Sequence, residues 1–135
     1  MKAVVLEKGE LRLKDIPQPS PQENEALVKV LKAGICNTDL ELVKGYMEFE
    51  GVLGHEFVGQ VIQASKKSWV GKRVAGEINL SCGKCDLCRR GLALHCLSRN
   101  VLGIQNRDGA FAQFLTLPLK NLHPLPSNIS DAEGV

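Results

Sequence analysis

The stretch Cys82-Gly-Lys-Cys85-Asp-Leu-Cys88-Arg-Arg-Gly-Leu-Ala-Leu-His-Cys96 places four cysteines in one short loop, at spacings of two, two and seven residues. Soft thiolates at such spacings are typical of a tetrahedral Zn²⁺ site, and four protein ligands leave no open position for chemistry. Cys36 makes the number of cysteines odd, which does not suit a framework of disulfides. We therefore expect a structural zinc in a loop lobe over residues 79–97.

Three other interpretations of the four cysteines stay open. An iron–sulfur cluster also takes four cysteines, but the bacterial ferredoxin pattern has a shorter last gap and a proline after the fourth, where this chain has Leu97. A nucleic-acid-binding zinc module would offer aromatic side chains for stacking, and none lies between Trp69 and Phe111. The third is that the four thiols are free. Structural zinc is favoured over all of them.

The composition is that of an ordinary globular domain. The chain has 135 residues, of which 44% are hydrophobic and 4% aromatic, so the core must consist mainly of aliphatic side chains. A net charge of +2 lacks the basic footprint of a nucleic-acid or membrane-surface binder. No apolar stretch approaches the length of a membrane span or has the form of a signal segment. We therefore expect a cytoplasmic protein that binds neither nucleic acid nor membranes.

The remaining sequence consists mostly of short segments with the features of β-strands. Alternation and β-branched residues predict strands over 2–6, 11–16, 26–33, 57–62, 70–75, 101–104 and 111–117. One short helix is expected over 37–45, since Thr38-x-x-Glu41 has the form of a capping box and Gly45 can end the helix. Six or seven short strands with little helix indicate an all-β barrel or sandwich.

The last residues also resemble the beginning of a helix. Ser130-Asp-Ala-Glu133 has the form of a second capping box, two residues before the final residue, Val135. A capping box begins a helix, but the sequence stops before the helix is formed. This predicts that the chain is a piece of a longer protein.

Cys36 and the pair His55-Glu56 offer a thiolate, an imidazole and a carboxylate. These are the ligand types of a catalytic zinc that keeps one position open for substrate. Thr38 could form a hydrogen bond to a bound alcohol, and Asp39 could orient the His55 ring. Plainer interpretations exist: Cys36 as a small buried side chain, His55 as a core histidine, Thr38 as a helix cap and Asp39 as a solvated acid.

Several ordered motifs together resemble a known family. They are Gly34-Ile-Cys36-x-Thr38-Asp39, Gly54-His55-Glu56-x-x-Gly59-x-Val61, Gly71-x-Arg73-Val74, the four-cysteine loop, Gly109-Ala-Phe-Ala-Gln-Phe, Asn121-Leu and Leu125-Pro126. In this order the motifs resemble the N-terminal catalytic domain of zinc-dependent medium-chain alcohol and polyol dehydrogenases. The resemblance runs over nearly the whole chain.

The resemblance implies a GroES-like β-barrel over residues 1–135, with the structural zinc in its lobe and a catalytic zinc at Cys36 and His55. It implies that Thr38 takes the substrate's proton, and that Glu56 is a nearby carboxylate which in some members binds the zinc directly. Glu41 stands where several members have the histidine that ends the proton relay. In the full-length enzyme an alcohol or polyol would pass a hydride to NAD(P), and the protein could form a homo-oligomer.

NAD(P) would bind a Rossmann domain, and no Gly-x-Gly-x-x-Gly occurs among the thirteen glycines of this chain. We therefore expect the chain alone to be inactive. The alternative is a stand-alone zinc-stabilised β-barrel used for binding or assembly, with apolar surface as its partner interface.

Overall fold

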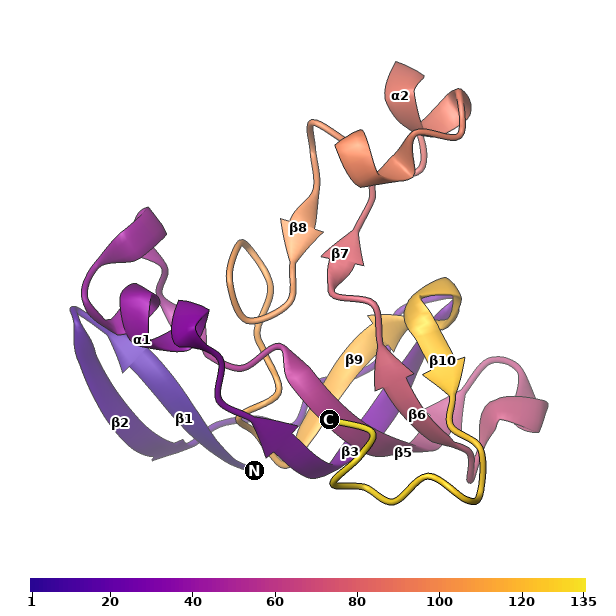
Figure 1. Ribbon diagram of the computed structural model, residues 1–135, viewed down its shortest axis with the longest axis horizontal. Coiled ribbons are helices and arrows are strands. Elements are labelled where there is room, and N and C mark those ends of the chain that lie inside the picture. Colours follow the sequence, from indigo (N-terminus) through magenta and orange to yellow (C-terminus); the bar gives the residue numbers. More distant parts are fainter.

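The computed structural model describes all residues from 1 to 135 and is built mainly of antiparallel β-strands (Figure 1). The strands are β1 Lys2–Glu7, β2 Glu10–Asp15, β3 Glu25–Gly34, β4 Gly51–Val52, β5 Glu56–Ala64, β6 Arg73–Gly76, β7 Asn79–Leu80, β8 Asn100–Val101, β9 Phe114–Pro118 and β10 Leu122–Pro124. The expectation of a mainly β chain with one or two short helices is confirmed.

Helical structure is limited to short segments. The two α-helices are α1 Asn37–Val43 and α2 Asp86–Arg89. Single 3₁₀ turns cover Tyr46–Glu48, Lys67–Trp69, Ala93–His95 and Leu119–Asn121. None of these helices is long and apolar enough to cross a membrane.

A five-stranded sheet in the order β10-β6-β5-β3-β9 forms the body of the molecule and curls into a half-barrel (Figure 1). Irregularities in the register between β3 and β5, at Leu27/Val28 and Val30/Lys32, accompany this curvature. The concave side is filled by aliphatic side chains, among them Val28, Val61 and Leu117, all of which are fully buried. Burial of these apolar side chains is the main force that holds the sheet in its curled form.

A smaller sheet in the order β2-β1-β4 closes one side of the body. The expected hairpin is confirmed as β1 and β2, which pair from Lys2 with Asp15 to Glu7 with Glu10. Helix α1 packs against this sheet through a small second core of Leu6, Leu42 and Leu53. This packing fixes the start of α1 relative to the strands.

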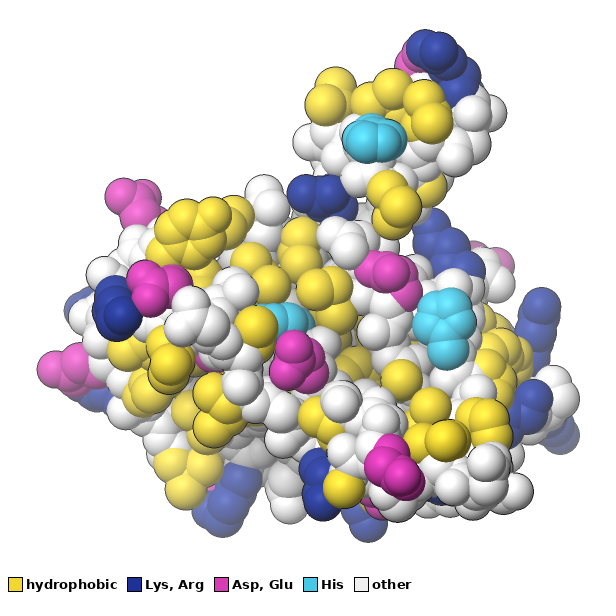
Figure 2. Space-filling model, in the orientation of Figure 1, with side chains coloured by type: hydrophobic (Ala, Val, Ile, Leu, Met, Phe, Trp, Pro, Cys, Tyr) yellow, Lys and Arg dark blue, Asp and Glu magenta, His cyan; other side chains and the backbone are white.

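The four-cysteine loop forms a lobe that projects from the body on the short antiparallel pair β7 and β8 (Figure 1). Figure 2 shows the lobe as a separate protrusion with basic side chains at its tip. Its exposed apolar side chains include Leu94 and Leu97, which are 64% and 88% exposed. Since so few apolar side chains are buried in the lobe, its order must depend on something other than a hydrophobic core.

Three strands are shorter in the structure than predicted. The strand expected over 70–75 begins only at Arg73, because Gly71 adopts a φ of +86° in a turn. The strand expected over 101–104 ends at Val101, which exchanges backbone hydrogen bonds with Gln105 across a tight turn. The strand expected over 111–117 begins at Phe114. Before it, the chain pairs only irregularly with its neighbours.

Both expected capping boxes differ in detail. Helix α1 is capped by Cys36, whose backbone amide donates to the Asp39 carboxylate at 2.8 Å, and not by Thr38. Ser130 and Glu133 do make the reciprocal contacts of a capping box. They close a turn, and residues 130–133 are not helical.

Candidate metal centres

The ligand atoms of Cys36, His55 and Glu56 lie within 4.8 Å of one another. Cys36 follows the end of β3, whereas His55 and Glu56 stand at the start of β5. Pairing of β3 with β5 places Gly34 opposite Glu56 and so brings the two strand ends together. The three side chains that the sequence grouped by chemistry are thus brought together by the sheet.

Asp39 ties the two halves of this cluster to each other. Its Oδ2 accepts a hydrogen bond from the backbone amide of Cys36 at 2.8 Å, and its Oδ1 accepts one from the amide of Gly54 at 3.3 Å. The carboxylate is almost fully buried, at 2% exposure. A buried carboxylate with two backbone donors is strongly held in place, so it fixes Cys36 and the residue before His55 at a set distance.

The His55 ring is buried, and its Nδ1 faces this same carboxylate. Nδ1 lies 3.4 Å from Asp39 Oδ1 but makes no hydrogen bond, which leaves it an unpaired buried polar atom. A carboxylate beside one ring nitrogen is the usual support for a histidine whose other nitrogen binds a metal. His55 would therefore present Nε2 to an ion, and a small closure of the Asp39 contact would satisfy Nδ1.

Gly54 makes the close turn before His55 feasible. Its φ of +92° is strained for any side chain, and a Cβ at this position would overlap the Phe111 ring. The Gly54 carbonyl also accepts a hydrogen bond from the amide of Ala110. The backbone directly before His55 is therefore fixed by the core.

Glu56 and Thr38 lie at the open side of the cluster. Glu56 is exposed, in contrast to the buried His55. The Thr38 hydroxyl lies 3.7 Å from Cys36 Sγ, within the reach of a weak hydrogen bond from the thiol. Glu41, one helical turn further, accepts a hydrogen bond from Lys44 at 2.9 Å. The cluster thus has two buried or half-buried donors and one donor that is free to move.

The four cysteines of the lobe form a second cluster, also with all ligand atoms within 4.8 Å. Cys82 Sγ is 4.0 Å from Cys88 Sγ, and Cys85 Sγ is 3.9 Å from Cys96 Sγ. Two backbone amides of the loop, those of Cys82 and Cys85, donate to sulfur atoms at 3.3 and 3.4 Å. Amide donors around sulfur offset part of the negative charge that thiolate ligands bring to a dication.

The thiols of the lobe differ in acidity. Hydrogen bonds from the backbone of Lys84, and then of Cys85, lower the pKa of the Cys82 thiol to about 6. Burial, together with the Cys85 thiol, raises the pKa of Cys88 to about 12. The loop by itself thus lowers the pKa of the Cys82 and Cys85 thiols, and a bound dication would stabilise all four cysteines as thiolates.

Both clusters fit zinc, but in different ways. Four sulfurs from one loop provide a complete tetrahedral set, which is the arrangement of a structural site. One sulfur, one imidazole and one carboxylate provide three donors and leave a fourth position free. Only the second arrangement can bring a substrate atom into contact with the ion.

Comparison with known proteins identifies the family of this chain. The family model described as the alcohol dehydrogenase GroES-like domain matches residues 22–127. The chain belongs to this family. The GroES-like fold and the resemblance drawn from the motifs are thereby confirmed.

This GroES-like domain has many similar proteins. L-Threonine 3-dehydrogenase of Alteromonas mediterranea is 38% identical over 142 residues, which cover 97% of the chain and 41% of that enzyme. A short chain alcohol dehydrogenase from Escherichia coli CFT073, solved with NADH, has a TM-score of 0.91 and 33% identity over 99% of this chain and 41% of its own. Haloferax mediterranei glucose dehydrogenase, in complex with NADP, Zn and gluconolactone, has a TM-score of 0.85 and 28% identity, with coverage of 99% and 41%.

The GroES-like domain described here thus spans about two-fifths of the length of the curated relatives that it matches. One feature of its site was not evident in the sequence. Asp39 was expected to orient His55, but its bonds to the amides of Cys36 and Gly54 were not foreseen. The spacing Cys36-x-x-Asp39, which is that of a cap and its partner, was the available signal.

Proposed function

We propose that this chain is the catalytic-domain portion of a zinc-dependent, NAD(P)-dependent alcohol or polyol dehydrogenase. The observation that carries the proposal is the convergence of Cys36, His55 and Glu56 within 4.8 Å. Three protein donors would leave the fourth position of a tetrahedral zinc open for substrate. The dehydrogenase names of the relatives support the same reaction class. In the complete enzyme the reaction is oxidation of the substrate alcohol with hydride transfer to nicotinamide.

Each residue of the cluster has a distinct part. Cys36 and His55 are the firm ligands, and Glu56 is the third donor, able to approach or withdraw because it is exposed. Zinc, when bound, supplies Lewis-acid chemistry at the substrate oxygen. The Thr38 hydroxyl would accept the proton of the substrate alcohol and release its own proton towards solvent, since it is half-buried and lies beside Cys36 Sγ and hence beside the open position. Asp39 keeps Cys36 and His55 at a fixed separation.

The four cysteines Cys82, Cys85, Cys88 and Cys96 are proposed to hold a structural zinc. Their lobe has little apolar core of its own, so metal binding would supply the free energy that orders it. NAD(P) is proposed to bind outside these 135 residues. Relatives solved with NADH or with NADP and Zn support both cofactor assignments.

A chimera tests the proposal directly. Residues 1–135 would replace the matching segment of the Alteromonas mediterranea L-threonine 3-dehydrogenase, and NAD(P)H formation would be measured with a panel of alcohols and polyols. We expect activity that is lost in Cys36→Ser and falls by at least about a hundredfold in Thr38→Ala. The exposed pair Arg12 and Glu10 offers a matched control, Arg12→Gln, which should be fully active.

The alternative is a zinc-stabilised barrel that binds a partner without catalysis. It is favoured by an apolar groove of about 610 Å³, lined in part by the exposed Leu11, Leu13 and Ile35. It offers no reason for a buried histidine held beside a carboxylate, a thiol and a hydroxyl. A folded chimera without activity on any alcohol, with zinc confirmed at both sites, would favour this alternative.

A further inference from the structure

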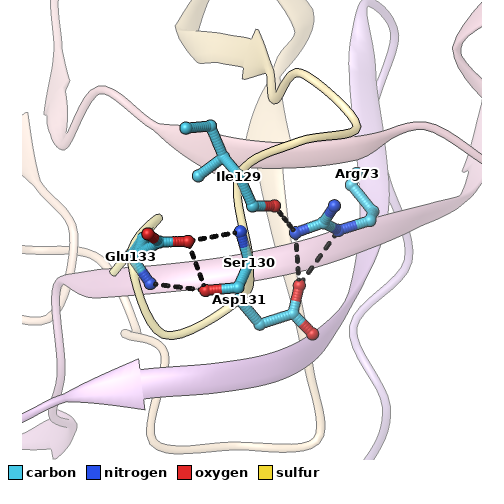
Figure 3. Close-up of polar contacts among 5 residues, drawn as sticks. All are labelled: Arg73, Ile129, Ser130, Asp131 and Glu133. Carbon is cyan, nitrogen blue, oxygen red and sulfur yellow. Dashed lines mark hydrogen bonds and ion pairs between the residues drawn. The ribbon is translucent and has the colours of Figure 1, made fainter.

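The last seven residues, 129–135, lie against the five-stranded sheet, and Arg73 of that sheet forms polar contacts with them (Figure 3). Arg73, at the start of β6, donates from Nε to Asp131 Oδ1 at 2.9 Å and from Nη2 to the Ile129 carbonyl at 2.7 Å. Its Nη2 also lies 2.6 Å from Asp131 Oδ1. A guanidinium that bonds both a carboxylate and a backbone carbonyl fixes the position and the direction of the segment.

The segment is also closed on itself. The amide and hydroxyl of Ser130 donate to Glu133 Oε2 at 2.9 and 2.7 Å, and the amide of Gly134 donates to the Ser130 carbonyl. A Cβ at Gly134 would come within 2.8 Å of both Leu125 and Val58, so the backbone lies directly on the sheet. The turn therefore sets where the chain goes after Glu133.

This route brings Val135 to the Cys36–His55–Glu56 cluster. Val135 lines a hollow of about 350 Å³ together with His55 and Glu56. A Cβ placed on Gly34 would lie 2.8 Å from Val135 Cγ1 and 2.9 Å from Glu56 Oε2. The valine side chain and the carboxylate thus border the same space over Gly34, two residues before Cys36.

Glu56 needs a neighbouring side chain that restricts its movement more than Cys36 and His55 do. Its side chain is exposed, and an exposed glutamate samples many rotamers. The loss of these rotamers on metal binding costs entropy and lowers the affinity for the metal. A neighbour that already excludes the outward rotamers reduces this cost and so raises the affinity. Val135 is an apolar side chain that borders the same space over Gly34 as Glu56 Oε2 does.

We propose that Arg73 is a positioning residue for the Cys36–His55–Glu56 metal site. It holds segment 129–135 on the sheet, and the segment in turn holds Val135 against Glu56, which keeps the carboxylate on the side of Cys36 and His55. The inference rests on the proposed function, because it requires that this cluster binds a metal.

The test is a Co²⁺ titration of the chain with its lobe already loaded with zinc, followed by the sulfur-to-cobalt absorption that Cys36 contributes. We expect Arg73→Gln to weaken Co²⁺ binding about tenfold, the lower end of what loss of a supporting contact costs a metal site. Asp131→Asn, which cuts the same contact from the other side, should weaken it similarly. Arg12→Gln removes an arginine from an exposed ion pair elsewhere and should bind Co²⁺ as the unmodified chain does.

A double variant shows whether Arg73 acts through Glu56. In the Glu56→Gln background, Arg73→Gln should cause little further loss of affinity, because the group that it positions is already gone. An undiminished tenfold loss in that background would overturn the proposal and make Arg73 a general structural residue. Unchanged affinity in both Arg73→Gln and Asp131→Asn would also overturn it. If the unmodified chain shows no thiolate–Co²⁺ absorption from Cys36, the proposed function itself fails.

Discussion

Asp39 joins more parts of the site than any other single residue. One carboxylate accepts backbone hydrogen bonds from Cys36 and Gly54 and faces Nδ1 of His55. Because it is buried, each of these contacts is made away from competing water. Fold stability and metal binding therefore depend on the same side chain.

Asp39→Asn should lower both the stability of the fold and the affinity of the site for metal. The amide has one acceptor oxygen in place of two and no charge, so one backbone donor is left unpaired. We expect a loss of about 1–3 kcal/mol in the free energy of unfolding and about tenfold or more in Co²⁺ affinity at Cys36 and His55. Urea unfolding and metal titration measure the two effects. Asp15→Asn, in an exposed pair with Lys2, is the control, and equal stability of the two variants would contradict the prediction.

The sequence indicated the residue types of this site but not its internal bonds. A thiol, an imidazole and a carboxylate can be recognised as zinc ligands from their chemistry alone. The sequence alone could not show that Cys36 rather than Thr38 caps the helix, because threonine has the higher intrinsic preference for the N-cap position. The hydrogen bond from the Gly54 amide to Asp39 favours Cys36 as the cap, since it holds the Asp39 carboxylate where the Cys36 amide can donate to it.

At the scale of elements, the lobe and the β3–β5 junction should hold zinc with different strength. Four thiolates from one loop bind more tightly than two firm ligands and one mobile carboxylate. We expect one zinc per chain to remain after dialysis against a mild chelator, with Cys88→Ser releasing it and Cys36→Ser leaving it in place. Metal analysis of the dialysed proteins measures this. Two retained zinc ions, or loss of the tight ion in Cys36→Ser, would mean that the sites are assigned the wrong way round.

The turn at residues 130–133 should respond to pH. The Ser130 hydroxyl, followed by its amide, lowers the pKa of Glu133 below its ordinary value of 4.5. A carboxyl whose pKa is lowered by folding stabilises the folded turn above the unfolded pKa, and this stabilisation is lost as the pH falls through the folded pKa. The amide resonance of Ser130 should therefore shift as the pH is lowered below 4.5. A Glu133→Gln variant should show no such transition, and an identical shift in that variant would contradict the assignment.

Elements with a clear hydrophobic period could be predicted from the sequence. The bounds of elements that begin or end at turns could not. The hairpin of β1 and β2 follows from strict alternation around a tight turn. The strand at β6 was expected three residues too early, because Val70 has strand propensity but precedes Gly71, whose left-handed backbone belongs to a turn. Propensity is a local quantity, whereas the end of a strand is set by where its partner ends.

At the scale of the whole molecule, the site exists because the sheet pairs two distant strands. Gly34 stands opposite Glu56 in the β3–β5 ladder, and the end of the chain packs over this same point. Neither relation can be derived from spacing along the sequence, since register depends on how the entire sheet curls. The motifs could therefore indicate which residues matter, while the approach of Val135 and Glu56 to the same space over Gly34 required the structure.

The 135-residue chain by itself should not reduce NAD(P)⁺. Hydride transfer needs the nicotinamide held about 3–3.5 Å from the substrate carbon, and the chain lacks the Gly-x-Gly-x-x-Gly turn that would bind the cofactor's pyrophosphate. We expect no increase in absorbance at the NAD(P)H band with any alcohol, even when metal analysis shows zinc at both clusters. The chimera described above, assayed at equal zinc content, is the positive control. Turnover that scales with the concentration of the isolated chain and disappears in Cys36→Ser would show that these residues hold the cofactor themselves.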